Sequence, residues 1–410
     1  MKWLEPALAR TVAEALADAL PGSREDREAR CLDVLGACDE EALASLLERV
    51  PPSLAWRALV AWILGDDAFA QLLAGGVAVE PPRAKAPSRF EVPSLDTEGD
   101  LAAWLAVTPR TLEAFTDPTD ATRRAPRGPM RHYTHRWVGA RLIEAPKPRL
   151  RALQRRILRG VLDAVPPHDA AHGFRRGRSI FTSAAPHAGK PAVLRVDLRR
   201  FFQTVHLARV VAVFSALGYP RAVSRAFARV CTHAVPDDEL VGQPFLARQR
   251  LRTRHLPQGA PTSPALANLA AHGLDVRLSA LARAAGLAYT RYADDLVFSG
   301  DVAPGFASRV ASICAEEGFP VATEKTRLRR ASDQQRVVGL VVNDHLGVAR
   351  SERDRLRAIL HNCARSGVTA ENRAGHADFR AHLEGRVSFV EQADPRQGAR
   401  LRRLFTAISW

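Results

Sequence analysis

The feature that most constrains the fold of this chain is a pair of adjacent carboxylates, Asp294 and Asp295, between two short apolar runs. Residues 289–292 and 296–298 carry the β-branched and aromatic side chains that are typical of strands. The spacing predicts two strands with the Asp pair at their turn. Neighbouring carboxylates repel each other unless a cation lies between them, and their oxygens suit Mg²⁺. The pair is therefore a candidate metal site, with an ordinary Asp-Asp turn as the alternative.

The charge of the chain points to an anionic partner. Its 410 residues include 59 basic and 44 acidic side chains, which give a formal net charge of +15. So much positive charge would repel itself without a partner, which favours nucleic acid. A solvated, arginine-rich surface is the alternative explanation.

Other compositional features exclude some classes of protein. No apolar run approaches the roughly 20 residues that a membrane helix needs, and the first residues lack a signal-peptide pattern, so we expect a cytoplasmic protein without a membrane partner. The five cysteines are scattered without metal-binding spacing, which predicts buried thiols: Cys31, Cys38, Cys231, Cys314 and Cys363.

The first part of the chain is predicted to be helical. Apolar spacing indicates helices over Leu4–Leu20, Glu40–Val50 and Trp56–Leu64, and the proline-rich segment Glu80–Pro93 predicts a linker. Asp96–Phe115 predicts two tightly joined helices, the second starting at Thr108-Pro109. This module carries no recognisable chemistry.

A dense cluster of basic residues follows. It comprises Arg123, Arg124, Arg127, Arg131, Arg136, Arg141, Lys147, Arg149, Arg151, Arg155, Arg156 and Arg159, with His132, Tyr133 and Trp137 interleaved. Arginine pairs with phosphate through two bonds and aromatic rings stack on bases, so the cluster favours nucleic-acid binding. The apolar stripe of residues 150–162 also predicts a helix, whose far side would be a solvated face if no ligand binds.

Two further segments carry candidate functional residues. Gly173 and Gly177 lie in a basic loop that also contains Arg175, Arg176 and Arg178. Such glycines allow a backbone to approach a ligand closely. Ala192–Leu198 predicts a buried strand that brings Asp197 to its end. A carboxylate there is well placed to bind metal, although capping of the next turn is the alternative.

The residues that could bind a nucleotide lie further along the chain. After a helical stretch over Val210–Ala234 and a polar insertion over Pro236–His255, a turn at Pro257–Gly259 precedes a helix that starts at Ser263-Pro264. This junction can present Gln258 and the backbone amide of Gly259 to a base and a phosphate.

The remaining segments complete the predicted site. We expect a helix over Phe306–Glu317, an extended segment over Val321–Leu328 that bears Lys325, a strand over Val337–Asn343 and basic helices to the end. Three carboxylates, a glycine loop and a following lysine suit two-metal phosphoryl transfer, in which Lys325 neutralises or protonates the departing pyrophosphate.

The order and spacing of these motifs over about residues 131–345 resemble reverse transcriptases. The matching segments are Val196–Phe202 (first palm motif), Leu256–Pro264 (nucleotide pocket), Tyr292–Asp295 (catalytic hairpin), Gly318–Lys325 (lysine motif) and Val337–Asn343 (primer-side strand). The resemblance implies an α+β right-hand polymerase with an antiparallel palm sheet and an N-terminal helical extension. The expected divisions are residues 1–93 (extension and linker), 94–190 (fingers and basic region), 191–345 (palm) and 346–410 (helical thumb).

The resemblance also implies roles for individual residues. Asp197 and Asp294 would bind two Mg²⁺ ions, helped by Asp295 and the backbone carbonyl of Leu198. Phe202 would be the steric gate against a ribose 2′-hydroxyl, because a clash discriminates better than a contact. Gln258 and Gly259 would line the nucleotide pocket, and Arg141 would bind the triphosphate, with Arg136 as a possible substitute for a missing lysine.

Within reverse transcriptases, Arg141–Leu158 and Ala171–Ile180 resemble the bacterial retron class. Three features depart from that pattern. Residues 183–187 read Ser-Ala-Ala-Pro-His where retrons have Asn-Ala-x-x-His, residues 337–339 read Val-Val-Gly where retrons have Val-Thr-Gly, and the fingers hairpin over Trp137–Arg141 is short. The first two departures bear on RNA recognition, not on polymerisation.

The retron resemblance implies a polymerase that copies its own structured noncoding RNA, starting from a guanosine 2′-hydroxyl. Its product would be RNA-linked multicopy single-stranded DNA, made from dNTPs, often in antiphage defence with a separate effector protein. Candidate RNA contacts are Arg149, Arg151, Arg155, His172, Arg175, Arg176, Arg178, His187, Arg402 and Arg403. The alternatives are a group II intron enzyme, for which about 65 residues after Asn343 leave little room, a retron-like defence polymerase with conventional priming and a non-catalytic RNA-binding scaffold.

Overall fold

The computed structural model describes residues 13, 16, 31, 40–51, 56–74, 90–139 and 141–410. The chain forms two compact units, Met1–Pro87 and Ser88–Trp410. In the first unit the described helices are α3 (Glu40–Arg49), α4 (Trp56–Leu64) and α5 (Asp67–Ala74). The first two confirm the helices predicted over Glu40–Val50 and Trp56–Leu64. The helix predicted over residues 4–20 and most of the predicted linker, residues 80–89, lie outside the described residues, apart from residues 13 and 16.

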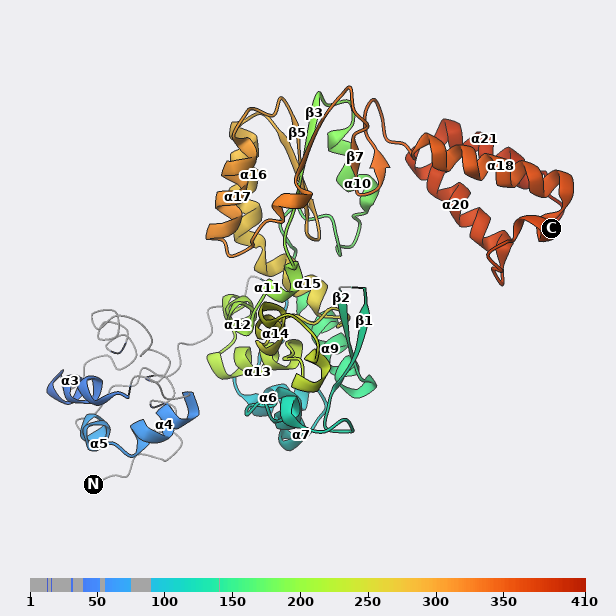
Figure 1. Ribbon diagram of the computed structural model, residues 1–410. Helices are drawn as coiled ribbons and strands as arrows, with labels where there is room; N and C mark the ends of the chain where they lie inside the picture. The colour runs from blue at the N-terminus through green and yellow to red at the C-terminus, as the bar shows by residue number, and fades with distance from the viewer. Residues whose placement is uncertain are drawn as a thin grey trace. The chain divides into compact units, whose positions relative to one another are not determined.

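The second unit is built on a four-stranded antiparallel sheet of order β4-β5-β3-β6 (Figure 1). Its strands are β3 (Ala192–Asp197), β4 (Ala288–Tyr292), β5 (Asp295–Gly300) and β6 (Arg327–Arg330). The pairing places Leu194 opposite Phe298 and Asp197 opposite Asp295. The mixed α+β class and the antiparallel sheet are therefore confirmed.

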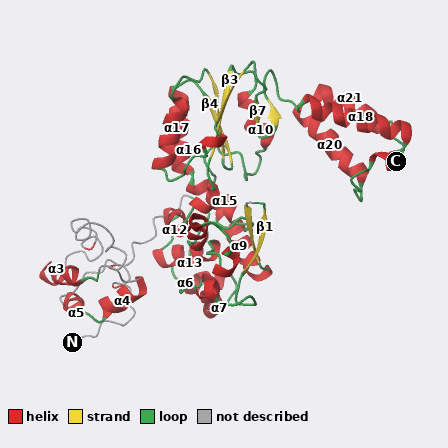
Figure 2. Cartoon of the chain, in the orientation of Figure 1, coloured by secondary structure: helices red, strands yellow, loops and turns green. Residues whose placement is uncertain are grey.

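Both faces of the sheet are covered, which explains why three consecutive residues of β5, Leu296, Val297 and Phe298, are apolar. Leu296 and Phe298 join one core cluster, whereas Val297 joins another. In Figures 1 and 2, helices α16 (His272–Ala284) and α17 (Phe306–Glu316) lie along one face and α10 (Ile180–Ala184) lies at the other. Strands that are buried on both faces lose the usual alternation of polar and apolar residues.

A mostly helical region precedes and interrupts the sheet. It contains α6 (Glu98–Trp104), α7 (Pro109–Thr116), α8 (Ala121–Arg124), strands β1 (Tyr133–Val138) and β2 (Arg141–Pro146), α9 (Pro148–Gly160), α11 (Phe201–Thr204), α12 (Leu207–Ala216), α13 (Arg221–Cys231), α14 (Phe245–Arg252) and α15 (Ser263–Ala270). Thr108 caps α7 with Pro109 in its first turn, as predicted. The helical stretch predicted over 210–234 comprises two helices, because Gly218 adopts φ +89° and Pro220 follows.

The last part of the chain is helical, as predicted, with α18 (Arg350–Ser366), α19 (Val368–Glu371), α20 (Phe379–Ala393) and α21 (Pro395–Thr406). The strand predicted over Val337–Asn343 is wrong: Arg336–Val337 (β7) and Leu340–Val341 (β8) form a tight hairpin. Val338 and Gly339, at φ +43° and +90°, turn the chain between them. The extended segment predicted over 321–328 contains a 3-10 turn at Thr323–Lys325 before β6 begins.

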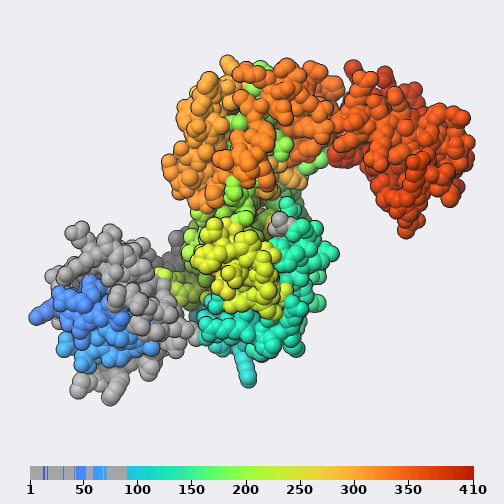
Figure 3. All heavy atoms as spheres, in the orientation of Figure 1, coloured from blue at the N-terminus to red at the C-terminus, as the bar shows by residue number. Residues whose placement is uncertain are grey.

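The insertion predicted to be polar, residues 236–255, contains α14 and three exposed apolar side chains. Val241, Phe245 and Leu246 are 78%, 61% and 65% exposed. This segment is yellow in Figure 3 and lies on the face shown there. Cys31, Cys231, Cys314 and Cys363 are buried free thiols, as predicted, and Cys38 is outside the described residues. Within the described part of the chain, every helix is too short or too polar to cross a bilayer.

Candidate active site

Three carboxylates meet at one edge of the central sheet. Asp197 ends β3 directly opposite Asp295, the first residue of β5. The N–H of Leu198 donates to the carbonyl of Asp294 over 2.9 Å, which ties the hairpin turn to the end of β3. The predicted grouping of Asp197, Asp294 and Asp295 is therefore present in the structure.

The turn differs in detail from the expectation. Strand β4 ends at Tyr292 and β5 begins at Asp295, so Ala293 and Asp294 form the turn and Asp295 lies in the strand. Ala293 adopts φ +57° whereas Asp294 keeps a negative φ, which is the pattern of a type II′ turn. The two adjacent carboxylates consequently occupy different backbone environments.

The charges at this edge are only partly balanced. Burial raises the pKa of Asp294, and the charges of Asp197 and Asp295 raise it further. Lys325 Nζ lies 3.0 and 3.2 Å from the two carboxylate oxygens of Asp197, which raises the pKa of Lys325. Arg195 Nη2 lies 3.1 and 3.2 Å from the oxygens of Asp295. A half-buried carboxylate beside two others fits a hard divalent cation, which would offset their repulsion.

A buried ion pair supports the turn that carries Asp294. Arg291 and Asp275 are both fully buried, and Arg291 Nη2 lies 2.5 Å from Asp275 Oδ2. Arg291 Nη1 donates to the Ala293 carbonyl over 3.1 Å and to Asn268 Oδ1 over 2.9 Å. These bonds join the turn to α15 and α16. This support was not predicted from the sequence, although a charged residue inside an apolar strand was a signal for it.

The basic glycine loop packs against the same turn. His172 N–H donates to the Arg291 carbonyl over 2.8 Å, and a Cβ on Gly173 would lie 2.7 Å from the Ala293 nitrogen. Asn268 Nδ2 donates to the Gly173 carbonyl over 2.9 Å. The close approach that we expected toward a ligand is therefore, at Gly173, an approach to the chain's own turn.

The predicted nucleotide loop is held by β2. Glu144 N–H donates to the Gln258 carbonyl over 2.8 Å. Gly259 adopts φ +135°, and a Cβ there would lie 2.9 Å from the Glu144 carbonyl oxygen. Ser263 Oγ at the start of α15 donates to the Pro257 carbonyl over 2.8 Å. The packing thus requires glycine at residue 259, and it leaves the Gln258 side chain partly exposed.

The candidate gate has an aromatic neighbour that the sequence did not reveal. The Phe202 ring is partly buried, and its centroid lies 5.8 Å from that of Phe201 and 6.0 Å from that of Phe174. Phe174 is 49% exposed and adopts φ +61°, a conformation that bulky residues rarely adopt. Arg141, the triphosphate candidate, is exposed at the first position of β2.

The candidate RNA contacts fall into two groups. Arg149, Arg155, Arg176 and Arg403 are exposed and Arg151 is partly exposed, whereas Arg175 and Arg178 lie 3.2 and 4.0 Å from Asp169. Arg402 forms ion pairs with Glu384 and Glu391 inside the C-terminal helices. The exposed members remain accessible to a ligand.

The two histidines among these candidates are buried. His187 is 0% exposed, with Nδ1 2.6 Å from Ser299 Oγ and Nε2 2.8 Å from Thr290 Oγ1. His172 is 4% exposed and lies 2.9 Å from Thr182 Oγ1. Burial lowers the pKa of His172 to about 4 and that of His187 to about 3. These positions are unsuited to direct RNA contact, and both rings instead join neighbouring segments.

Comparisons with known proteins agree with this geometry. Residues 137–342 match the family described as reverse transcriptase (RNA-dependent DNA polymerase). The chain is 44% identical to the retron Mx65 reverse transcriptase of Myxococcus xanthus, over 77% of this chain and 73% of that protein. It is 39% identical to the retron Mx162 reverse transcriptase of the same organism, over 63% and 56% of the two chains. It is 32% identical to the retron Ec86 reverse transcriptase of Escherichia coli, over 66% and 76%.

Proposed function

The chain belongs to the retron reverse transcriptases, a group of RNA-dependent DNA polymerases, and from this membership we propose how its residues carry out DNA synthesis. The observation that carries the proposal is the meeting of Asp197, Asp294 and Asp295 at one sheet edge. Polymerases of this family use divalent metal. We assign the metal to this edge, as two Mg²⁺ ions held by Asp197 and Asp294 with Asp295 and the Leu198 carbonyl in support.

The bound ions would lower the charge barrier to in-line displacement at phosphorus. In that reaction the primer hydroxyl oxygen forms a bond to the α-phosphorus of a dNTP, the bond to pyrophosphate breaks and the hydroxyl proton passes to solvent. Lys325, which is 60% exposed beside Asp197, is free to turn toward the departing pyrophosphate and neutralise it. Arg141 would bind the triphosphate, and Gln258 and Gly259 would line the nucleotide pocket.

We assign the regions of the chain by the same reasoning. Residues 191–345 contain the sheet and would form the palm, 94–190 the fingers and 346–410 a helical thumb, with 1–93 as an N-terminal extension. The exposed arginines Arg149, Arg155, Arg176 and Arg403 would bind the phosphates of a structured noncoding RNA. This RNA would supply both the template and the primer.

We further propose priming from a guanosine 2′-hydroxyl, which yields RNA-linked single-stranded DNA with a role in antiphage defence. The support is the similarity to several retron enzymes, because three carboxylates do not by themselves distinguish a 2′-hydroxyl from a 3′-hydroxyl. The competing function is conventional 3′ priming, as in group II intron enzymes.

The test is synthesis by the purified protein with its cognate RNA, dNTPs and Mg²⁺. We expect DNA that retains RNA after denaturation and loses it on treatment with a debranching enzyme. The matched control is the Asp294→Asn, Asp295→Asn variant, which should bind the RNA and make no DNA. A product that carries an ordinary 3′–5′ junction to its primer would contradict the priming proposal and leave the polymerase assignment intact.

A further inference from the structure

A second cluster of possible metal ligands lies where the β1–β2 hairpin meets the segment before the nucleotide loop. His135 and Glu144 are directly opposite each other in the β1–β2 pair. His233 and His255 face each other in an isolated antiparallel bridge, closed by backbone hydrogen bonds of 2.9 and 3.0 Å. Two cross-strand pairs thus bring three imidazoles and one carboxylate together.

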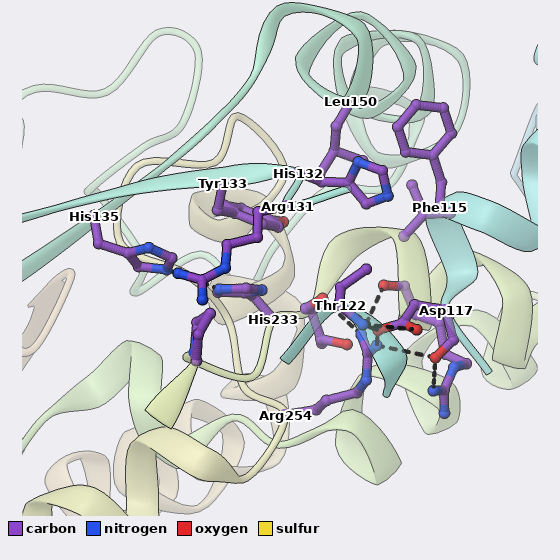
Figure 4. A pocket seen from close by; sticks show the side chains of 14 residues that line it. Phe115, Asp117, Thr122, Arg131, His132, Tyr133, His135, Leu150, His233 and Arg254 are labelled. Carbon is purple, nitrogen blue, oxygen red and sulfur yellow. Dashed lines mark hydrogen bonds and ion pairs between the residues drawn. The ribbon is translucent and has the colours of Figure 1, made fainter. Parts of the chain in front are cut away.

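The two pairs contact each other through their side chains. His135 Nε2 lies 2.9 Å from His233 Nε2, and His255 Nε2 lies 3.2 Å from Glu144 Oε2. Ligand atoms of His135, Glu144 and His233 all lie within 4.8 Å of one another. Figure 4 shows His135 and His233 beside each other at the edge of a pocket that Tyr133 and Arg131 also line.

One detail of this cluster points to a missing ligand. The 2.9 Å contact between the two imidazole nitrogens is a hydrogen bond in which one ring donates, and it brings the two possible ligand atoms together. Glu144 is fully buried, and its Oε1 atom has no hydrogen-bond partner among the described residues. A buried carboxylate oxygen without a partner is costly, so it points to an ion or other group at this position.

We propose that His135, His233 and Glu144 bind a divalent transition-metal ion of the zinc type. Two imidazoles and a carboxylate are a ligand set that zinc accepts, and the pocket beside the two histidines leaves space for a water as fourth ligand. Zinc–nitrogen bonds of about 2.0–2.1 Å in a tetrahedron need the two nitrogens about 3.3 Å apart. The histidines would therefore separate by only a few tenths of an ångström from their present contact.

The surroundings suit such an ion. Burial lowers the pKa of His135 and of His233, which favours the neutral form of the ring that can offer a lone pair. The His255 ring holds Glu144 Oε2 and leaves Oε1 for the ion. The positive charge of Arg131 is offset by Asp238 and Glu239, at 2.8 and 3.4 Å.

An ion at this position would act on the nucleotide pocket through the backbone. Glu144 holds the carbonyl of Gln258 and packs against Gly259, both of which belong to the predicted pocket. The ion would join β1 and β2 to the segment of His233, and thereby fix the hairpin against the loop. This structural site goes beyond the polymerisation chemistry and uses none of its carboxylates.

The test is cobalt(II) titration of metal-free full-length protein that carries Asp197→Asn and Asp294→Asn, which removes the carboxylate site. We expect one cobalt per chain with the intense visible absorption of a four-coordinate site, because six-coordinate oxygen sites absorb weakly. Adding Glu144→Gln or His233→Gln should abolish the band. The matched control is His132→Gln, since His132 lines the same pocket but bonds to the Ala114 carbonyl, and this variant should retain the band.

A folding control separates lost ligands from lost structure. Zinc should raise the melting temperature of the parent protein and leave that of His233→Gln unchanged. A His233→Gln variant that still binds cobalt normally would overturn the proposal, as would a parent protein that shows no four-coordinate band. Neither result would bear on DNA synthesis, which is measured separately with the unsubstituted carboxylates.

Discussion

At the scale of single residues, the proposed gate residue Phe202 has an aromatic neighbour, Phe174. Phe174 remains in a left-handed conformation although it is half exposed, and such strain persists only where neighbouring contacts impose it. The Asn268 bond to the Gly173 carbonyl is one such contact. Because the Phe174 ring lies 6.0 Å from that of Phe202, we expect it to limit the movement of the gate.

The prediction concerns sugar selectivity. Phe202→Ala should raise ribonucleotide use relative to deoxyribonucleotide use by about tenfold or more, equivalent to ~1.4 kcal/mol of discrimination. Phe174→Leu should raise it less, and the double variant should be less than additive, because the two rings act on one another. The ratio of kcat/KM values for the two sugars is the measurement. Phe181→Leu, which removes a ring paired with Phe389, is the control, and unchanged selectivity in Phe202→Ala would remove Phe202 from the gate.

A second residue-scale prediction follows from the buried ring of His187. Its folded-state pKa of about 3 lies below the usual 6.5 of the unfolded chain, so the unfolded state binds more protons between these values. The stability from neutral His187 is present above pH 6.5 and declines as pH falls toward 3. Between pH 7 and pH 5 the free energy of unfolding should fall by about 2 kcal/mol from this group.

Urea unfolding at the two pH values measures that loss, and His187→Gln should remove it while it keeps one hydrogen bond. The exposed His361 offers a matched control, because His361→Gln should leave the acid sensitivity unchanged. An unchanged pH dependence in His187→Gln would assign the acid sensitivity to other groups.

At the scale of elements, the loop that contains Gly173 packs directly against the hairpin that carries Asp294 and Asp295. A Cβ on Gly173 would meet backbone atoms of the turn, the nearest being the Ala293 nitrogen at 2.7 Å, so something must move. Gly173→Ala should therefore lower kcat at least tenfold, because Asp294 follows Ala293 directly and would be displaced with it. Single-turnover synthesis measures the effect. Gly347→Ala, which has open space around its Cβ, should retain activity, and equal activity in the two variants would show that the turn tolerates the displacement.

The same elements show how far sequence reasoning extends. The strand over Ala192–Leu198 and the Asp hairpin were predictable because their apolar runs are short and bounded by turns. The hairpin at Val337–Val341 was not, because an apolar run does not reveal the positive φ at Val338. The burial of His187 was also hidden, since its partners Thr290 and Ser299 lie more than 100 residues away in sequence. Contacts of that kind depend on the register of the sheet.

At the scale of the whole molecule, some of the excess basic residues form ion pairs with acidic side chains and others do not. Arg277, Arg291 and Arg402 form ion pairs with acidic side chains of the protein, whereas no ion pair is found for Arg155, Arg156 or Arg159 within the described residues. These three side chains share one side of α9 and line a groove with Trp104, whose ring lies 5.5 Å from the Arg156 guanidinium. A groove that combines arginines outside ion pairs with a partly buried tryptophan ring suits the phosphates and bases of RNA.

The last prediction tests RNA binding by the arginines of α9 through the salt dependence of the affinity. Arg155→Gln should weaken binding of the cognate RNA and flatten the plot of log affinity against log salt by about 0.7–0.9, because one phosphate contact is lost. Arg277→Gln removes the same charge from an arginine already paired with Glu316 and Glu317, so its slope should remain that of the parent. Filter binding at several salt concentrations gives both slopes. If the two variants have equal slopes, the arginines of α9 form a solvated face, and the RNA binds elsewhere on the protein.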